Sequence, residues 1–379
     1  MQRRNRFLLL VAMSRRKFFE ILFASLVLGW VVAYGSDATK TRLSDGTVVS
    51  VTHGRCSNCD LPYQLDRIGF TFGNDWWGSG TFMPKDNGAG ASTILHTVDR
   101  GKHWDQLPFS KSRSGEEAPA FFFLDPLHGW VSSFDSWNAQ GTLSWTVDGG
   151  KSWKRTPSGA ISQLQFIDSL HGYLAGTALS GGFFGATSDG GVTWARTELP
   201  LSQVDAMSFT GHSDGILVGT QNTEKGPVPD VLVTRDGGLS WEQSRLPDGL
   251  GSARIHDFVR PSALTAYLSV WLSDQQGSEL LESLDGGKTW QRLVADFVGV
   301  TGKYILAVAF TPSGRGYVFY SDQATRSNFV ALSTNGNGAW KSEWFPLAVT
   351  TCIGLETTIV CSSKMDTVIL TESVVGSSH

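Results

Sequence analysis

One short motif occurs six times along the chain and constrains its fold more than any other feature. Each copy has Ser or Thr, then Asp or Asn two positions later, a Gly-containing stretch and a Trp. The five full copies contain Asp99, Asp148, Asp189, Asp236 and Asp285, and end in Trp104, Trp153, Trp194, Trp241 and Trp290. The sixth, degenerate copy has Asn335 and Trp340. The repeat length of about 40 to 50 residues is typical of a four-stranded β-propeller blade.

The residue types in the motif favour a tight reversal between two strands. Asp accepts hydrogen bonds from backbone amides two or three residues ahead, and Gly supplies positive φ angles. The hydroxyl can close the same turn, and Trp begins the outgoing strand with a ring to bury between sheets. Because turn chemistry accounts for these aspartates, we predict structural roles for them and no catalytic or metal-binding ones.

A second pattern precedes most of these turns and supplies the other strands. An apolar strand ending in Phe is followed by Gly and an aromatic residue, as in Phe123, Gly129 and Trp130. The period-2 alternation marks strands and the Gly-containing breaks mark hairpins. Each repeat therefore supplies four strands.

These patterns predict an all-β fold, a seven-bladed β-propeller of four-stranded antiparallel blades in one domain, 36–379. The blades are expected to start near residues 65, 119, 162, 204, 255, 305 and 350. The seventh has only three strands, and the strand-like segment 47–52 is expected to complete it and close the ring. A six-bladed ring with an appended hairpin is the alternative.

Residues 1–35 are predicted to be an export signal, either cleaved or kept as an N-terminal membrane anchor. Basic residues precede the apolar run 21–34, which is shorter than the ~20 residues that span a membrane. The segment 14–18, Ser-Arg-Arg-Lys-Phe, resembles a twin-arginine signal. Translation from Met1 or from Met13 predicts export equally, to a periplasmic or other extracytoplasmic compartment.

The four cysteines fit an oxidising compartment. Cys56 and Cys59 precede the first blade, and Cys352 and Cys361 flank a predicted two-residue turn at 356–357, which places them opposite each other. We therefore expect the disulfides Cys56–Cys59 and Cys352–Cys361. Crossed pairs or a four-cysteine zinc site are the alternatives.

Charge and motifs exclude several functions. The formal net charge of −4 removes a general electrostatic argument for nucleic-acid binding. The sequence has no Gly-x-x-x-x-Gly-Lys-Ser/Thr phosphate-binding loop and no His-Glu-x-x-His motif. His128 and His171 occupy equivalent Leu-His-Gly turns of successive blades, and we interpret them as turn residues too far apart to share an ion. We expect no cofactor and no metal.

The hydroxyl-x-Asp-x-Gly-x-x-Trp turns resemble the Asp-box, or BNR repeat, of sialidases, sortilin-type receptors and related propellers. Together with the Phe and Gly-aromatic pattern, they are similar to the photosystem II stability/assembly factor family and its bacterial relatives. The resemblance covers nearly all of the chain after residue 60. It implies an exported, non-enzymatic propeller that helps to assemble an envelope or membrane complex.

A sialidase-type glycoside hydrolase is the alternative function. Such an enzyme needs clustered arginines, a Tyr nucleophile with a Glu partner, and an Asp acid/base at the ring centre. Arg67 lies about where the first arginine of such an enzyme falls, but Gly69 replaces the proline of that motif. No complete catalytic set emerges, so we interpret Arg67 as an ordinary surface residue and name no catalytic residue.

The strand order places the Asp-containing turns on one face of the ring, together with the turns between first and second strands. The longer connections lie on the other, which we call the long-loop face. Loops on a rigid scaffold concentrate functional residues, and Trp is a frequent interface anchor. The candidate contact residues on this face are Trp76, Trp137, Trp271, Lys85 and Arg113. We expect a monomer with a protein or membrane-complex partner, and membrane contact only through an uncleaved N-terminus.

Overall fold

The computed structural model describes residues 39–56, 63–82, 91–107, 120–135, 140–272, 277–334, 336, 339–355, 357–364 and 366–372. The chain divides into two units, Met1–Thr39 and Lys40–His379. The predicted signal, 1–35, lies outside the described residues. In the described part of the chain, no helix is long and apolar enough to cross a membrane.

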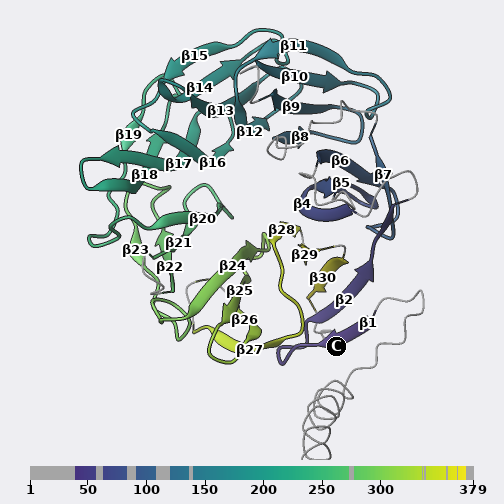
Figure 1. The fold of residues 1–379 in the computed structure, drawn as a ribbon, viewed down its shortest axis with the longest axis vertical. Helices are drawn as coiled ribbons and strands as arrows, with labels where there is room; N and C mark the ends of the chain where they lie inside the picture. The colour runs from purple at the N-terminus through teal and green to yellow at the C-terminus, as the bar shows by residue number, and fades with distance from the viewer. Residues whose placement is uncertain are drawn as a thin grey trace, which may run out of the picture. The chain divides into compact units, whose positions relative to one another are not determined.

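Seven sheets form a ring in the second unit (Figure 1). The first strand of each blade lies towards the centre and the fourth lies towards the rim. Blade 1 contains β4 (Tyr63–Phe72), β5 (Asp75–Phe82), β6 (Ala91–Thr97) and β7 (His103–Gln106). Blade 2 contains β8 (Phe121–Phe123), β9 (Gly129–Asp135), β10 (Gln140–Thr146) and β11 (Lys154–Ser158). Blade 3 contains β12 (Ile161–Phe166), β13 (Gly172–Ala178), β14 (Gly181–Thr187) and β15 (Ala195–Glu198).

Blades 4 to 6 follow the same order. Blade 4 contains β16 (Gln203–Thr210), β17 (Asp214–Thr223), β18 (Gly226–Thr234) and β19 (Glu242–Gln243). Blade 5 contains β20 (Arg254–Val259), β21 (Ala266–Trp271), β22 (Ser278–Ser283) and β23 (Gln291–Arg292). Blade 6 contains β24 (Lys303–Phe310), β25 (Gly316–Asp322), β26 (Ser327–Ser333) and β27 (Lys341–Phe345). The predicted seven-bladed propeller is confirmed, and the six-bladed alternative is wrong.

Blade 7 is built from both ends of the ring-forming sequence. Its inner strands are β28 (Thr351–Leu355), β29 (Thr358–Ser363) and β30 (Asp366–Thr371), and β2 (Val48–His53) pairs antiparallel with β30. This closure by the 47–52 segment was predicted. The outer strand β1 (Thr39–Arg42) and the short β3 (Arg55–Cys56), which runs parallel to β7, were not.

The blade register confirms how the turns are distributed between the two faces. In blade 5, Val259 at the end of the first strand pairs with Tyr267, and Ala266 at the start of the second strand pairs with Ser283. The turn between the first two strands and the Asp-containing turn therefore leave from the same end of the sheet. We call this end the Asp-turn face.

The Asp-containing turns are held by a repeated set of hydrogen bonds, which blade 2 illustrates. Asp148 Oδ1 accepts from Thr146 Oγ1 at 2.8 Å and from the Ser152 amide at 2.9 Å, and Oδ2 accepts from the Ser152 hydroxyl at 2.6 Å. The Gly150 amide donates to Thr146 Oγ1, and Trp153 Nε1 donates to the Gly150 carbonyl at 3.0 Å. The strongest amide contact of Asp is thus four residues ahead, and the amide three residues ahead, which was predicted, also acts on the carboxylate.

These bonds make the turns sensitive to acid. The hydroxyl and amide of Ser152 lower the pKa of Asp148 to about 2, and equivalent donors do the same for Asp189 and Asp236. A carboxylate with a folded-state pKa below its unfolded value stabilises the fold above about pH 4, and this stabilisation is lost as the pH falls towards 2.

We expect the melting temperature of Asp148→Asn to change less than that of the wild type between pH 4 and pH 2. Asp248→Asn, at an exposed site, is the control. A wild-type pH profile in Asp148→Asn would contradict this role.

Aromatic stacking joins successive blades. Phe166 of β12 lies 3.6 Å from Trp130 of blade 2, measured between ring centroids, with the ring planes 10° apart. A Cβ on Gly172 would lie 2.5 Å from the same Phe166 ring, so only Gly fits beneath it. This explains why Phe precedes Gly-aromatic in the repeat. The equivalent stacks between blades are Trp77–Phe123, Tyr173–Phe209 and Tyr267–Phe310.

The predicted Cys352–Cys361 disulfide is present. These residues are directly paired between β28 and β29, and Leu355 pairs with Thr358 across the two-residue turn. Crossed pairs and a four-cysteine zinc site are therefore wrong. Cys56 is also disulfide-bonded, and its predicted partner Cys59 lies outside the described residues.

Candidate functional site

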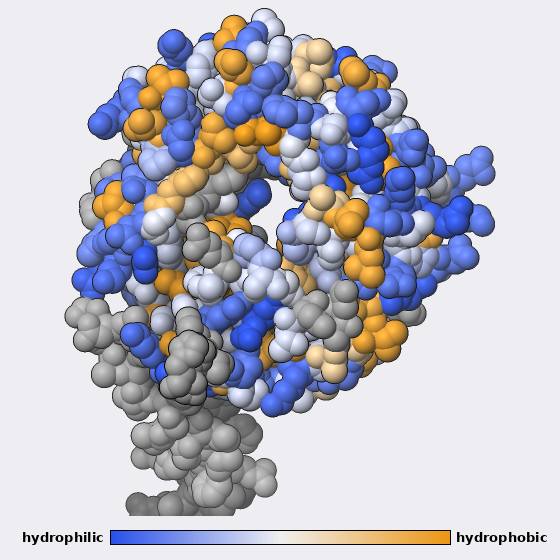
Figure 2. All heavy atoms as spheres, turned by 180° about the vertical axis from the view of Figure 1, so that it is seen from behind, coloured by the Kyte–Doolittle hydropathy of each residue, from blue (hydrophilic) through white to orange (hydrophobic). Residues whose placement is uncertain are grey.

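The inner strands of the ring surround a cavity of about 620 Å³. Residues of β4, β12, β16, β20, β24 and β28 line this cavity, which we call the central channel. Figure 2 shows an opening through the centre of the ring. Because the lining comes from six blades, residues far apart in the sequence meet around one space.

Two opposite charges from different blades face this channel. Asp257 of β20 accepts hydrogen bonds from the amides of Phe258 and Val308, each at 2.8 Å. Burial raises its pKa, although these amides and the charge of Arg67 act in the other direction. Desolvation by the surrounding protein lowers the pKa of the Arg67 guanidinium, and the negative charge of Asp257 acts in the opposite direction. The exposure of Arg67 agrees with its interpretation as a surface residue, and the surface on which it lies is the wall of the channel.

Arg260 and Asp205 also border the channel, but both Nη atoms of Arg260 and the carboxylate of Asp205 bond to neighbouring segments. Arg260 Nη1 donates to the carbonyls of Ser208 and Asp214, and Nη2 donates to that of Ala263. Burial lowers the pKa of Arg260 to about 10. Burial raises the pKa of Asp205, and Gln203 and Thr220 donate to its carboxylate. These two residues hold neighbouring segments together.

The channel lining can be compared with the requirements of a sialidase. Among the described lining residues there are two arginines, Arg67 and Arg260, and no Tyr or Glu. Gly69, which replaces the motif proline, has a packing reason. A Cβ at this position would lie 2.5 Å from the ring of Phe121 in the next blade.

An aromatic group lies beside the channel on the long-loop face. Trp271, at the end of β21, is 36% exposed and stacks on the ring of His256, a channel-lining residue, with centroids 4.2 Å apart. Trp271 Nε1 donates to the Ile305 carbonyl at 3.0 Å, and Tyr304 meets the indole edge-on. We call His256, Trp271 and Tyr304 the aromatic patch. Its hydrogen bond and stacking hold the indole in one orientation.

The other predicted contact residues are placed differently. Trp76 is 3% exposed and belongs to a core cluster with Leu65 and Trp104, so it is part of the core and not of a binding surface. The remaining candidates lie outside the described residues: Trp137, Lys85 and Arg113. Sequence reasoning found neither His256, which meets Trp271 between the paired strands β20 and β21, nor Asp257, which only the closed ring brings to the same channel as Arg67.

Comparison with known proteins supports the fold. No protein-family model matches the chain, and no curated protein matches it. Virginiamycin B lyase from Staphylococcus aureus has a similar structure, with a TM-score of 0.54 at 12% identity over 85% of this chain and 98% of that chain. A GH74 xyloglucanase from Xanthomonas campestris gives 0.53 at 14% identity, over 88% of this chain and 59% of that chain.

YCF48 from Cyanidioschyzon merolae has 17% identity to this chain, with a TM-score of 0.47 over 74% of this chain and 98% of that chain. At these levels of identity, the two similarities with TM-scores above 0.5 establish a shared fold alone. The chain is a seven-bladed β-propeller whose candidate site combines the central channel with the aromatic patch.

Proposed function

We propose that this protein is an exported, non-catalytic β-propeller that binds a protein or membrane-complex partner and acts as an assembly scaffold. The observation that carries the proposal is the aromatic patch. Trp271 is exposed, its indole is fixed by His256 and Ile305, and it stands beside the channel. Large aromatic side chains held in one orientation make strong interface anchors because little conformational entropy is lost on binding.

The channel suits a partner segment with polar groups. An apolar or aromatic side chain of the partner would cover Trp271, while Arg67 and Asp257 would meet its polar backbone or charged side chains. Charged groups that line a surrounded channel give specificity through complementary partners. The motif resemblance to the photosystem II stability/assembly factor family favours an assembly role. The Cys352–Cys361 disulfide favours an oxidising, extracytoplasmic compartment.

A sialidase-type glycoside hydrolase is the second candidate. The position of Arg67 in the channel favours it, whereas the described lining lacks the Tyr and Glu that the chemistry needs. Hydrolysis of a generic sialoside that Arg67→Ala abolishes would favour the enzyme over the scaffold.

Partner capture tests the scaffold. Trp271→Ala is expected to reduce recovery of a defined complex, after mild crosslinking in the native envelope, by at least about tenfold, since anchor residues contribute about 2 kcal/mol or more. The matched control is Leu264→Ser on the Asp-turn face, where Leu264 is 62% exposed. Loss of the complex in Leu264→Ser but not in Trp271→Ala would place the interface on the opposite face and contradict the proposal.

A further inference from the structure

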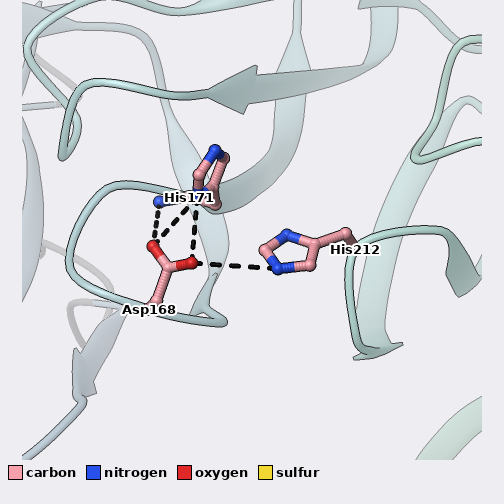
Figure 3. A group of neighbouring side chains, drawn as sticks. All are labelled: Asp168, His171 and His212. Carbon is pink, nitrogen blue, oxygen red and sulfur yellow. Dashed lines mark hydrogen bonds and ion pairs between the residues drawn. The ribbon is translucent and has the colours of Figure 1, made fainter.

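Three side chains with metal-binding atoms meet on the Asp-turn face, away from the channel. Asp168 and His171 lie in the turn between β12 and β13 of blade 3, and His212 lies in the turn between β16 and β17 of blade 4. One ligand atom from each lies within 4.8 Å of the other two. Figure 3 shows the Asp168 carboxylate between the two imidazoles.

The carboxylate of Asp168 is oriented by its own turn. Oδ1 accepts from the amides of Leu170 and His171, at 2.8 and 2.7 Å. These amides are the main reason that the pKa of Asp168 falls to about 2, so the carboxylate is ionised at neutral pH. Oδ2 lies 2.9 Å from His171 Nδ1 and 3.8 Å from His212 Nε2. One charged oxygen therefore adjoins a nitrogen of each imidazole.

The turn that carries His212 is fixed against blade 3. Tyr173 of β13 donates its hydroxyl hydrogen to the His212 carbonyl at 2.7 Å, and the two imidazole rings meet edge-to-face with centroids 4.9 Å apart. The three groups thus come from two blades that are joined by hydrogen bonds between side chains of blade 3 and the backbone of blade 4. His212 is exposed and Asp168 and His171 are half-buried, so an ion could reach them from solvent.

The spacing matches a small divalent ion. Zinc binds imidazole nitrogen and carboxylate oxygen at about 2.0–2.1 Å, and tetrahedral geometry then separates ligand atoms by roughly 3.3 Å. The separations of Asp168 Oδ2 from the two nitrogens, 2.9 and 3.8 Å, lie on either side of that value. The two nitrogens lie within 4.8 Å of each other, so a movement of the exposed His212 ring towards Asp168 and His171 would bring the three atoms to bonding distance of one ion.

Blade 2 contains the same turn without the third ligand. Its Asp125 and His128 have the spacing of Asp168 and His171, and their side chains are 2.7 Å apart. The position in blade 3 that corresponds to His212, counted from the Phe that ends the first-strand pattern, is Ser169. An Asp-x-x-His turn therefore forms without a metal, and His212 is the feature that distinguishes the blade 3 site.

We propose that Asp168, His171 and His212 form a binding site for a divalent transition-metal ion of the Zn²⁺ class that links blades 3 and 4. The ion takes Asp168 Oδ2, His171 Nδ1 and His212 Nε2, and water completes its coordination on the solvent side. On binding, the neutral His171 ring changes tautomer: the proton leaves Nδ1, where it otherwise bonds to Asp168, and Nε2 takes up a proton from solvent, so the Nδ1 lone pair faces the ion with no net loss of a proton. This site does not depend on the proposed scaffold function.

Calorimetric titration of the tag-free, oxidised protein with Zn²⁺ at pH 7.5 tests the site. We expect one site that His212→Ser weakens by at least about tenfold, because one of three protein ligands is lost. The Ser at the equivalent position in blade 3 indicates that this variant folds. Asp125→Asn, the matched control in blade 2, should bind like the wild type.

Thermal unfolding gives a second readout. Zn²⁺ should raise the melting temperature of the wild type and of Asp125→Asn, but not that of His212→Ser. Absence of a Zn²⁺ site in the wild type would overturn the proposal, as would equal affinity in His212→Ser. An equal loss of affinity in Asp125→Asn and His212→Ser would also overturn it.

Discussion

Replacing Phe166 with alanine is expected to lower the free energy of unfolding by about 3–5 kcal/mol. The ring is 2% exposed, stacks on Trp130 of the preceding blade and covers Gly172 of its own blade. Truncation removes the contact between two sheets and leaves a cavity at their interface. Denaturant unfolding followed by tryptophan fluorescence measures the change.

Trp344→Ala is the control for this experiment, because it also removes an aromatic side chain. Trp344 is 52% exposed on β27, at the outer side of blade 6. We expect its replacement to cost less than about 1 kcal/mol, as at other exposed sites. Similar losses in Phe166→Ala and Trp344→Ala would show that the stack between blades is not a main source of stability.

Replacing Val49 with aspartate is expected to cost about 4 kcal/mol or more, since it places a charge in a closed apolar cluster. Val49 of β2 is fully buried, lies opposite Leu370 of β30 and packs in the cluster between blades 6 and 7. The introduced carboxylate should detach β2 from blade 7. Denaturant unfolding and limited proteolysis within 39–53 measure the two consequences.

Ser50→Asp is the matched control for ring closure. Ser50 is the next residue of β2, lies opposite Ile369 and is half-buried. Neighbouring residues of a strand face opposite sides, so a charge here stays nearer to solvent and should cost less. Wild-type stability and protease resistance in Val49→Asp would mean that the buried face of β2 does not hold the ring closed.

The fold was predictable because the repeat encodes both the strands and their turns. Asp148 and its equivalents mark each third-to-fourth-strand turn, and the missing strand of blade 7 indicated the role of the 47–52 segment. The outer strand β1 and the parallel pairing of β3 with β7 could not be predicted. They are additions outside the repeat, and their pairing depends on which sheet edges the closed ring leaves open.

The candidate sites were less predictable, because they depend on contacts between blades. Arg67 carried a weak motif signal, but its electrostatic partner Asp257 lies four blades further along the chain. Trp271 was predicted as a contact residue from residue type and loop position alone, and the same reasoning selected the buried Trp76. The two residues lie at opposite ends of a second strand: Trp271 is the last residue of β21, whereas Trp76 is the second residue of β5 and pairs with Thr97, beside an Asp-containing turn.

His212 has an identifiable sequence signal, which is its place in the turn between the first and second strands of its blade. It lies in the same first-to-second-strand turn as His171, one blade later, but at a different offset from the strand ends. Residues at identical offsets from the strand ends were treated as equivalent, so His171 was related to His128 and not to His212. The neighbour of His171 across the interface between blades 3 and 4 is His212, and the hydrogen bond from the Tyr173 hydroxyl holds the turn that carries His212.

The pairing of β2 with β30 sets an order for folding. During synthesis, β2 emerges before any complete blade, and its partner β30 is among the last strands to appear. The apolar side of β2 therefore stays uncovered while the six other blades form. Joining segments this far apart carries a loop-closure cost and slows folding. A strand that precedes the other six blades in the sequence is therefore among the last to be placed. A chain interrupted before residue 366 would hold nearly all its blades but lack the strand that receives β2.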